Sequence, residues 1–304
     1  MEELKEIKEK YGKQIDYFTD NKLGIIVANS FDNNKKNIAG LEEKLNDIHL
    51  VLDCHIDLIK LFNTDNNLKL NIDGDKVIGA LDNTITNAIL LNILKQKDLA
   101  DDTLILFSIG EEHYCKGKKR NCDINEDAYC NDVDDDCRGF KEKNGARKLA
   151  KIIKQKKLQK KIKVINLDVT GKAYHGLHNK DNKFDNCSYA AFIEYDPIPN
   201  GEEETAKEYE ELYTKTEDER YGTLNKFQNF PKEFLKHVTF CDYNDEGTGD
   251  NLEKYQKRGI FGITFGLSTS NKIHSKNNYT TKSKIENYTE LLKNLIEEIK
   301  KVVI

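Results

Sequence analysis

Two adjacent carboxylates at the end of an apolar run are the first feature of this chain that suggests chemistry. The segment from Leu104 to His113 is a mostly apolar stretch followed by Gly110, Glu111 and Glu112. The apolar part has the length and composition of a buried strand. A solvated turn would explain an isolated Glu-Glu pair, because like charges held together are costly unless something positive compensates them. Other apolar runs here also end in metal-binding residue types, which favours a metal site.

A histidine and an aspartate two residues apart follow another apolar run. Ile48 to Leu52 leads into His55 and Asp57. Side chains two residues apart share a face of an extended chain. Asp57 is therefore suited to orient or polarise the His55 imidazole without contacting the metal itself. A lone His-x-Asp pair is more often a surface pair, so this interpretation depends on the other strand ends.

Three further segments supply residues of the same kind. Asp82 begins a helical segment, where N-capping is its alternative role. Asp168 ends a short apolar run, and His274 follows a run from Gly259 to Phe265. In open α/β sheets, ligands lie at the carboxyl ends of strands. We therefore expect these residues to converge, although they span most of the chain.

The converging residue types favour metal-assisted hydrolysis. Two imidazoles and three carboxylates form a ligand set suited to zinc, and a carboxylate can bridge two ions. One of the two adjacent glutamates, Glu111 or Glu112, is then not needed as a metal ligand. Bound ions lower the pKa of a water molecule, and a nearby general base takes its proton.

Strand-like and helical segments alternate along most of the chain. Amphipathic helical patterns occur at residues 1–20, 82–95, 144–159 and 283–302, between short apolar runs. This order predicts an α/β three-layer sandwich, in which helices cover both faces of a central, mostly parallel mixed sheet. The hydrophobic content of 38% suits one large core. No internal repeat is visible, and we expect residues 1–304 to form a single domain.

Residues 114–140 interrupt this alternation. They are rich in acidic residues, lack the apolar residues of a domain, and contain Cys115, Cys122, Cys130 and Cys137. The cysteine intervals do not match the short spacing of common zinc knuckles. Two disulfides would suit an oxidising compartment, with the pairing open, whereas an extra structural metal would suit a reducing cytosol, and the aspartates offer calcium ligands. We expect a stapled element at the rim of the site with no catalytic ligand.

Composition argues against several partner classes. The net charge is −5, from 48 basic and 53 acidic residues, which does not favour nucleic acid or an anionic membrane surface. No segment approaches the roughly 18 apolar residues that span a bilayer, and residues 1–13 lack the apolar region of a signal peptide. We expect a cytoplasmic protein that binds neither nucleic acid nor membranes. Its oligomeric state is left open.

The order His-x-Asp, Asp-Asn, Glu-Glu, Asp, His resembles that of the co-catalytic di-zinc exopeptidases. These are aminopeptidases of metallopeptidase family 28, with relatives in families 20 and 42. The resemblance extends from about Val51 to the C-terminus and implies the zinc-exopeptidase, phosphorylase/hydrolase-like fold. The interval between Asp168 and His274 leaves little room for the lid domain of family 20 members, which favours a single-domain, family-28-like architecture. The insert and His113 depart from the family pattern.

The resemblance also implies a metal centre of two zinc ions, for which cobalt or manganese are substitutes. His55 resembles the ligand of one ion, with Asp57 behind it as an accessory catalytic residue. Asp168 resembles the second ligand of that ion. Asp82 resembles the carboxylate that bridges both ions.

For the other ion and for catalysis, the resemblance implicates three more residues. Glu111 resembles the general base, while Glu112 and His274 resemble the ligands of the second ion. The implied activity is hydrolysis of a peptide or aminoacyl substrate at a chain terminus, as in an aminopeptidase. A carboxypeptidase or a deacylase on the same metal centre is an alternative, as is a catalytically inactive regulatory homologue. Because every ligand type and the base are present, loss of catalysis is disfavoured.

Overall fold

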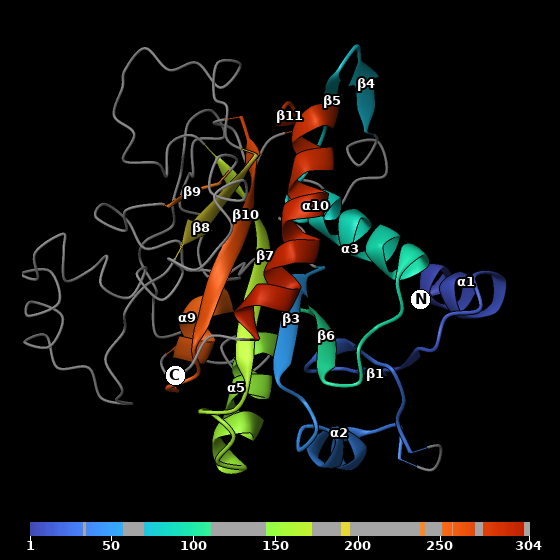
Figure 1. Cartoon of the computed structure of the whole chain (residues 1–304), viewed down its shortest axis with the longest axis vertical. Helices are drawn as coiled ribbons and strands as arrows, with labels where there is room; N and C mark the ends of the chain where they lie inside the picture. Colours follow the sequence, from blue (N-terminus) through green and yellow to red (C-terminus); the bar gives the residue numbers. More distant parts are fainter. Residues whose placement is uncertain are drawn as a thin grey trace, which may run out of the picture.

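The computed structural model describes most of the predicted core of the chain (Figure 1). The described residues are 1–32, 35–56, 70–110, 144–171, 190–194, 238–240, 251–256, 258–270 and 276–300. The cysteine-rich insert, residues 114–140, lies outside them.

A mixed sheet of eight strands forms the middle layer, in the order β1-β2-β6-β3-β7-β10-β8-β9. The strands are β1 (Asp16–Asp20), β2 (Gly24–Ala28), β3 (Leu50–His55), β6 (Thr103–Ser108), β7 (Lys163–Gly171), β8 (Ala191–Glu194), β9 (Val238–Phe240) and β10 (Gly262–Thr269). The four central neighbours, β6, β3, β7 and β10, run parallel to one another. Antiparallel pairings join β2 to β6 and β8 to β10 at either side.

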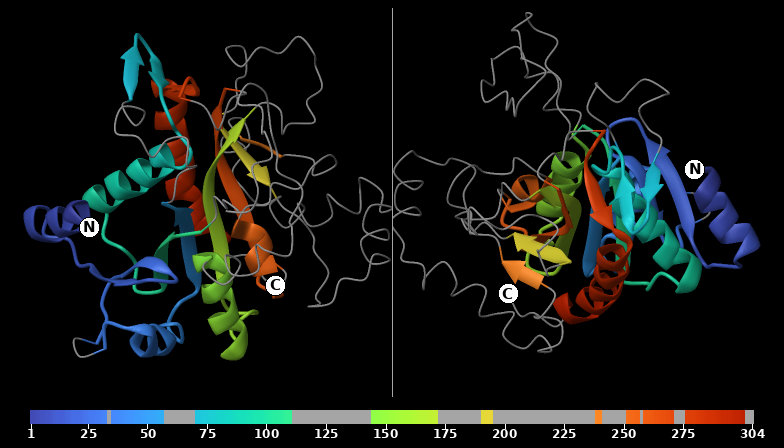
Figure 2. Two further views of the ribbon diagram at one scale, coloured as in Figure 1. Left: turned by 180° about the vertical axis from the view of Figure 1, so that it is seen from behind. Right: turned by 90° about the horizontal axis from the view of Figure 1, so that it is seen from above.

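Helices cover both faces of this sheet (Figure 2). They are α1 (Glu2–Lys10), α3 (Thr84–Gln96) and α10 (Lys282–Ile299) on one face, and α2 (Ile38–Lys44), α5 (Gly145–Gln155) and α9 (Asn251–Gln256) on the other. Side chains alternate between the two cores along each central strand, so that Leu50 and Leu52 of β3 pack with the first group and Val51 with the second. This arrangement confirms the three-layer α/β sandwich expected from the sequence.

The predicted helix over residues 1–20 is wrong in its second half. Helix α1 ends at Lys10, and Gly12 follows with a φ of 62°, the left-handed conformation that commonly ends helices. Asp16–Asp20 is instead the edge strand β1, which pairs antiparallel with β2. Its central Tyr-Phe-Thr sequence has high β-propensity.

Strand β7 is longer than the apolar run from Lys163 to Leu167 predicts. It continues to Gly171, because β10 pairs with it in parallel from Val164 onward over its whole length. Asp168 therefore lies within a strand and does not follow one.

A second, three-stranded sheet adjoins the carboxyl end of the central strands. It consists of β4 (Asn71–Asp73), β5 (Lys76–Ile78) and β11 (Tyr279–Thr281), in the order β11-β5-β4. The chain leaves β5 for α3 and leaves β11 for α10, so this small sheet ties together the starts of two neighbouring helices.

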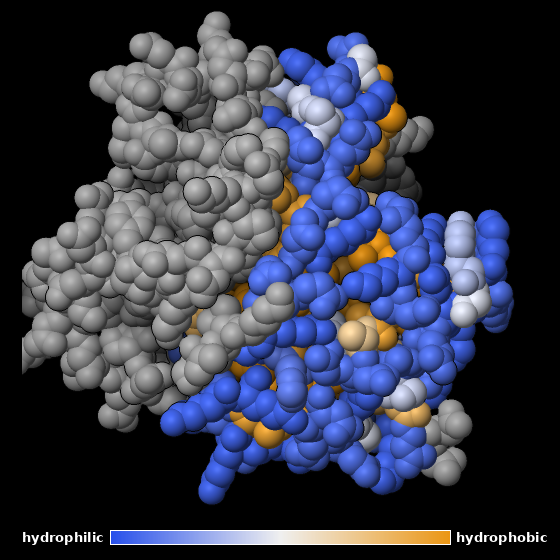
Figure 3. All heavy atoms as spheres, in the orientation of Figure 1, coloured by the Kyte–Doolittle hydropathy of each residue, from blue (hydrophilic) through white to orange (hydrophobic). Residues whose placement is uncertain are grey.

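The visible surface of the helices is mostly hydrophilic, and hydrophobic side chains show mainly in the gaps between elements (Figure 3). None of the helices in the described part of the chain has the length and hydropathy needed to cross a membrane.

The packing of α5 against the sheet gives a stability prediction at Gly145. A Cβ atom there would lie 2.1 Å from the Leu23 carbonyl oxygen, so Gly145→Ala must displace backbone. We expect a loss of about 3 kcal/mol in the free energy of unfolding, measured with urea, because overpacking a rigid core has costs of this order. Gly74→Ala is the control, since its Cβ would meet nothing within 4 Å and only the φ of 57° opposes it. Its expected cost is about 1 kcal/mol, and equal losses in the two variants would contradict the proposed clash.

Candidate metal centre

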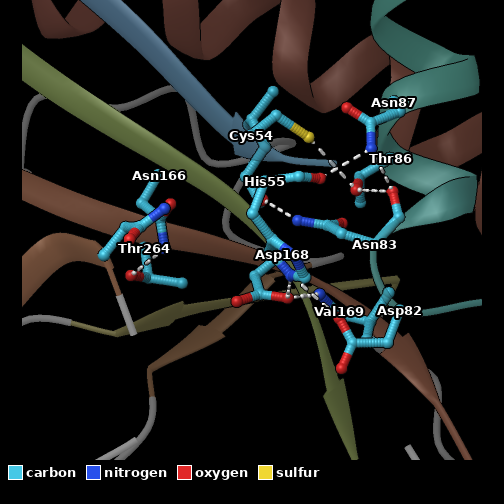
Figure 4. Close-up of polar contacts among 12 residues, drawn as sticks. Cys54, His55, Asp82, Asn83, Thr86, Asn87, Asn166, Asp168, Val169 and Thr264 are labelled. Carbon is cyan, nitrogen blue, oxygen red and sulfur yellow. Dashed lines mark hydrogen bonds and ion pairs between the residues drawn. The ribbon is translucent and has the colours of Figure 1, made fainter. Parts of the chain in front are cut away.

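Three residues of metal-binding type meet at the carboxyl edge of the central strands (Figure 4). His55, Asp82 and Asp168 each offer one ligand atom, and these atoms all lie within 4.8 Å of one another. The His55 Nε2 atom is 3.1 Å from Asp82 Oδ1 and 3.8 Å from Asp168 Oδ1. One imidazole and two carboxylates are donors that zinc accepts. The structure thus brings together three of the five residues that the sequence suggested as metal ligands.

The pairing of β3 with β7 accounts for two of these positions. Asp53 and Asn166 are register partners in this parallel pair. His55 and Asp168 come two residues later on their respective strands, and residues two apart share a face of the sheet. Both side chains therefore reach the same edge on the same side.

Asp82 comes from the segment that leads into α3. Its alternative role as the N-cap is not what the structure has, because α3 begins at Thr84 with Asn83 as its N-cap residue. The Asn83 side chain makes no capping hydrogen bond, and the Asp82–Asn83 peptide bond is cis. The Asp82 carboxylate contacts the His55 imidazole instead.

The three side chains are largely removed from water. His55 is 1% exposed and Asp82 6%, and the Asp168 side chain is 14% exposed. Two carboxylates this close together repel each other, and burial increases the repulsion. A cation between them, or a protonated imidazole, offsets this cost.

The first turns of α3 connect the backbone segments that carry these three residues. Asn83 directly follows Asp82, and its Nδ2 donates to the Leu167 carbonyl at 2.5 Å, next to Asp168. The Asn87 Nδ2 donates to the His55 carbonyl at 2.8 Å and to the Asn83 carbonyl at 2.9 Å. Because a carbonyl oxygen can only accept, these bonds fix which end of each amide carries the nitrogen. We call Asn83 and Asn87 the amide clamp.

The sequence interpretation missed the amide clamp. The Asp-Asn motif includes Asn83 but assigns it no role, and no motif includes Asn87. The signal available was the spacing of four residues, which puts two side chains on one face of a helix.

A second buried network fixes the end of β6. Asn251 Nδ2 donates to the Ser108 hydroxyl at 2.8 Å, while Asn144 Nδ2 donates to Asn251 Oδ1 and to the Gly110 carbonyl, both at 3.0 Å. Ser108, Asn144 and Asn251 are all at most 1% exposed. The network joins β6, α5 and α9 just before the two adjacent glutamates of the sequence.

Helix α9 also contacts β3 through a buried polar pair. The Tyr255 hydroxyl donates to Asp53 Oδ2 at 2.7 Å, and both residues are fully buried. Burial, followed by the charge of Asp53, raises the pKa of Tyr255 well above its ordinary value. The phenol therefore remains a hydrogen-bond donor at neutral pH and supports the strand that ends in His55.

Cys54, next to His55, belongs to the core. It is fully buried, and its Sγ lies 3.5 Å from the Thr86 hydroxyl on α3. Burial raises the pKa of the Cys54 thiol far above its ordinary value. It therefore stays protonated and does not act as a thiolate ligand.

The other predicted site residues, Asp57, Glu111, Glu112 and His274, lie outside the described residues. The last described residues before them are Ile56, Gly110 and Ser270. Their roles as accessory residue, general base and ligands stay predictions from the sequence.

No protein-family model and no curated protein matches the sequence. Among solved structures, the chain is similar to aminopeptidase APDkam598 from the archaeon Desulfurococcus kamchatkensis, with 15% identity, a TM-score of 0.46, and coverage of 78% of this chain and 54% of that one. Yeast aminopeptidase 1 is 11% identical, with a TM-score of 0.48 and coverage of 77% of this chain and 49% of that one. An endoglucanase from Thermotoga maritima is 12% identical, with a TM-score of 0.46 and coverage of 98% of this chain and 93% of that one. The chain thus spans about half the length of the two aminopeptidases. Likeness at such identities concerns the fold and says nothing of activity.

The cluster predicts that Asp82 is essential for metal binding. Asp82→Ala should lose most of the bound metal after zinc reconstitution and dialysis, because it removes one of the three clustered donors. Metal content measured by plasma mass spectrometry checks this. Asp73→Ala, which removes an exposed carboxylate on β4, is the control and should retain the wild-type content. Equal metal content in both variants would show that the cluster does not hold the ion.

The amide clamp predicts a graded loss of affinity. Asn87→Ala removes two hydrogen bonds to the site backbone and should weaken zinc binding by roughly 10–100-fold, the usual effect of losing a residue that supports metal ligands. Competition with a chromophoric chelator measures the affinity, and the melting temperature of the metal-free protein reports on the fold. Asn92→Ala, at an exposed position five residues further along α3 (92 − 87), is the control. An unchanged zinc affinity in Asn87→Ala would contradict the supporting role.

Proposed function

We propose that this protein is a metal-dependent exopeptidase that hydrolyses a peptide bond at a chain terminus, in the manner of an aminopeptidase. The observation that carries the proposal is the convergence of His55, Asp82 and Asp168 at the carboxyl edge of the parallel strands. One imidazole and two mostly buried carboxylates suit a divalent metal of the zinc type.

The proposed centre would hold two zinc ions. His55 and Asp168 would be ligands of one ion, Glu112 and His274 would be ligands of the other, and Asp82 would be shared by both. When bound, such ions would lower the pKa of a water molecule and polarise the scissile carbonyl. The role of Glu111 would be that of the general base, which accepts the proton of the attacking water.

The accessory residues hold this arrangement in position. Asp57 orients the His55 ring, and the amide clamp fixes the backbone beside His55 and Asp168. The dense polar contacts of the first turns of α3 thus serve to keep the donors in place before a metal arrives.

The strand order supports roles for the residues that the structure does not describe. Strands β6 and β10 flank β3 and β7, and all four are parallel. In the sequence, Glu111 follows the last residue of β6 by three positions (111 − 108), and His274 follows the last residue of β10 by five (274 − 269). The four strands therefore lead toward the same edge, as co-operation of these residues requires.

Several finer assignments are part of the proposal. The substrate is a peptide or aminoacyl compound, the native ions are zinc, and the compartment is the cytoplasm. A carboxypeptidase, a deacylase and an inactive regulatory homologue are the competing outcomes of the substrate test, since no described contact favours one of them.

The two adjacent glutamates give the test of mechanism. Glu111→Gln should keep the metal but lose turnover by about 10²–10⁴-fold, the usual contribution of a general base. Glu112→Gln, the matched variant one residue away, should instead weaken metal binding. Metal content and the hydrolysis of aminoacyl, N-acylated and C-terminally free substrates are measured on the zinc-loaded proteins.

The outcomes separate the parts of the proposal. Exchanged phenotypes would mean that the roles of the two glutamates are reversed. A fully loaded wild-type protein that cleaves none of these substrates would refute the peptidase assignment and leave the metal site standing.

A further inference from the structure

Two buried asparagines close a ring of hydrogen bonds with the end of β6. Asn251 Nδ2 donates to the hydroxyl of Ser108, the last residue of β6. Asn144 Nδ2 donates to Asn251 Oδ1, and it also donates to the carbonyl of Gly110. The ring thus starts at the end of the strand and returns to the same chain segment two residues later. We call Asn144 and Asn251 the asparagine pair.

The ring adjoins the row of the sheet that carries His55. Ser108 and His55 are register partners in the parallel pairing of β6 with β3. The Ser108 carbonyl also accepts from the Ile56 N–H at 2.9 Å, which joins the ends of the two strands. The asparagine pair therefore supports the strand end that lies next to the metal cluster.

Gly110 is the last described residue before the two adjacent glutamates. Its carbonyl belongs to the planar peptide group that also contains the nitrogen and the Cα atom of Glu111. The hydrogen bond from Asn144 to this carbonyl therefore restrains the peptide group from which Glu111 extends. The φ of Gly110 is 80°, a conformation that glycine adopts without strain, so the chain turns at this point.

Capping of α5 does not explain why residue 144 is an asparagine. Asn144 Oδ1 accepts from the Arg147 N–H at 2.7 Å, which is an N-cap bond that serine, threonine or aspartate could also make. Only an amide accepts such a bond and donates two others. Asn37, the exposed N-cap residue of α2, makes the corresponding bond to the Gly40 N–H at 3.1 Å. The two donations of Asn144 are thus additional to its capping role.

We propose that the asparagine pair positions the two adjacent glutamates for metal binding and catalysis. Asn144 restrains the peptide group that leads to Glu111, while Asn251 orients the Asn144 amide and ties it to β6. The inference rests on the proposed function, in which Glu111 is the general base and Glu112 a ligand of the second ion. Restraint matters here because a misplacement of about 1 Å can cost roughly 100-fold in rate.

Asn144→Ser is the test variant, because serine can keep the cap of α5 but lacks the two amide donors. Asn37→Ser makes the same change at the N-cap of α2 and is the matched control. Ser108→Ala removes the acceptor of Asn251 and leaves Asn144 in place. It is the milder variant that tests the ring if Asn144→Ser does not fold.

Two measurements are made on the full chain. Competition with a chromophoric chelator gives the affinity of each zinc equivalent, and kcat and KM are measured with the substrate class that the wild type cleaves. Asn144→Ser should weaken one of the two zinc equivalents by roughly 10–100-fold, the usual effect of losing a residue that supports metal ligands. The other equivalent should be unchanged, because the clustered donors His55, Asp82 and Asp168 are not part of the ring.

The kinetic constants should separate positioning from substrate binding. In Asn144→Ser, kcat should fall by about 10–100-fold at nearly unchanged KM, the order expected for a misplaced catalytic group. Ser108→Ala should show the same changes on a smaller scale. Asn37→Ser should match the wild type in zinc affinity, kcat and KM.

The outcomes distinguish this inference from the proposed function. If Asn144→Ser matches Asn37→Ser, or loses both zinc equivalents equally, the positioning role is overturned and the proposed function remains. If the wild type binds two zinc ions but cleaves no substrate, the peptidase assignment falls, and a selective loss of one equivalent in Asn144→Ser still supports the positioning role. Uptake of a single zinc ion by the wild type refutes the two-ion centre, and with it the role of the asparagine pair in holding the second ion.

Discussion

The repulsion between two mostly buried carboxylates is the constraint on which the rest of this structure depends. Asp82 and Asp168 are held near the His55 imidazole at a strand edge where little water reaches them. Such an arrangement is costly by itself, and the strands and helix that carry the three residues hold it in place against this cost. The β3–β7 pairing sets two of the side chains, and the amide clamp fixes the third segment against both strands.

The three-layer architecture could be predicted because the hydrophobic pattern of each strand and helix is a local property of the sequence. Central strands buried on both faces read as continuous apolar runs, and the helices that cover them are amphipathic, so alternation along the sequence revealed three layers. Two boundaries were wrong, for different reasons. For Asp16–Asp20 a local signal was present, since its Tyr-Phe-Thr sequence has high β-propensity and it pairs with the next strand, β2. For β7 the reason is not local, because it reaches Gly171 by pairing with β10. The pairing partners are distant in the chain for β7, and local propensity carries no information about them.

The residues of the candidate site differ in the same way: some have a role that the local sequence indicates, and others have a role that depends on distant partners. His55, Asp82 and Asp168 could be selected from the sequence because their residue types and their places at the ends of apolar runs are both visible there. Four asparagines could not, because each acts through a hydrogen bond to a group far along the chain. Asn83, Asn87 and Asn144 donate to backbone carbonyls, and Asn251 donates to the Ser108 hydroxyl. Asparagine is common in this sequence, and nothing in its local context separates a clamping residue from a surface one.

The placement of the three clustered residues also bears on how the chain folds. His55 and Asp82 are 27 residues apart, and Asp168 follows Asp82 by a further 86 (168 − 82). A metal ion held between them would therefore cross-link segments that are distant in the chain, and its binding energy would become part of the folding energy. By mass action, the stability of the fold would rise with the free metal concentration. A cell poor in that metal would then hold less of this protein in its folded form, so metal supply would regulate its abundance.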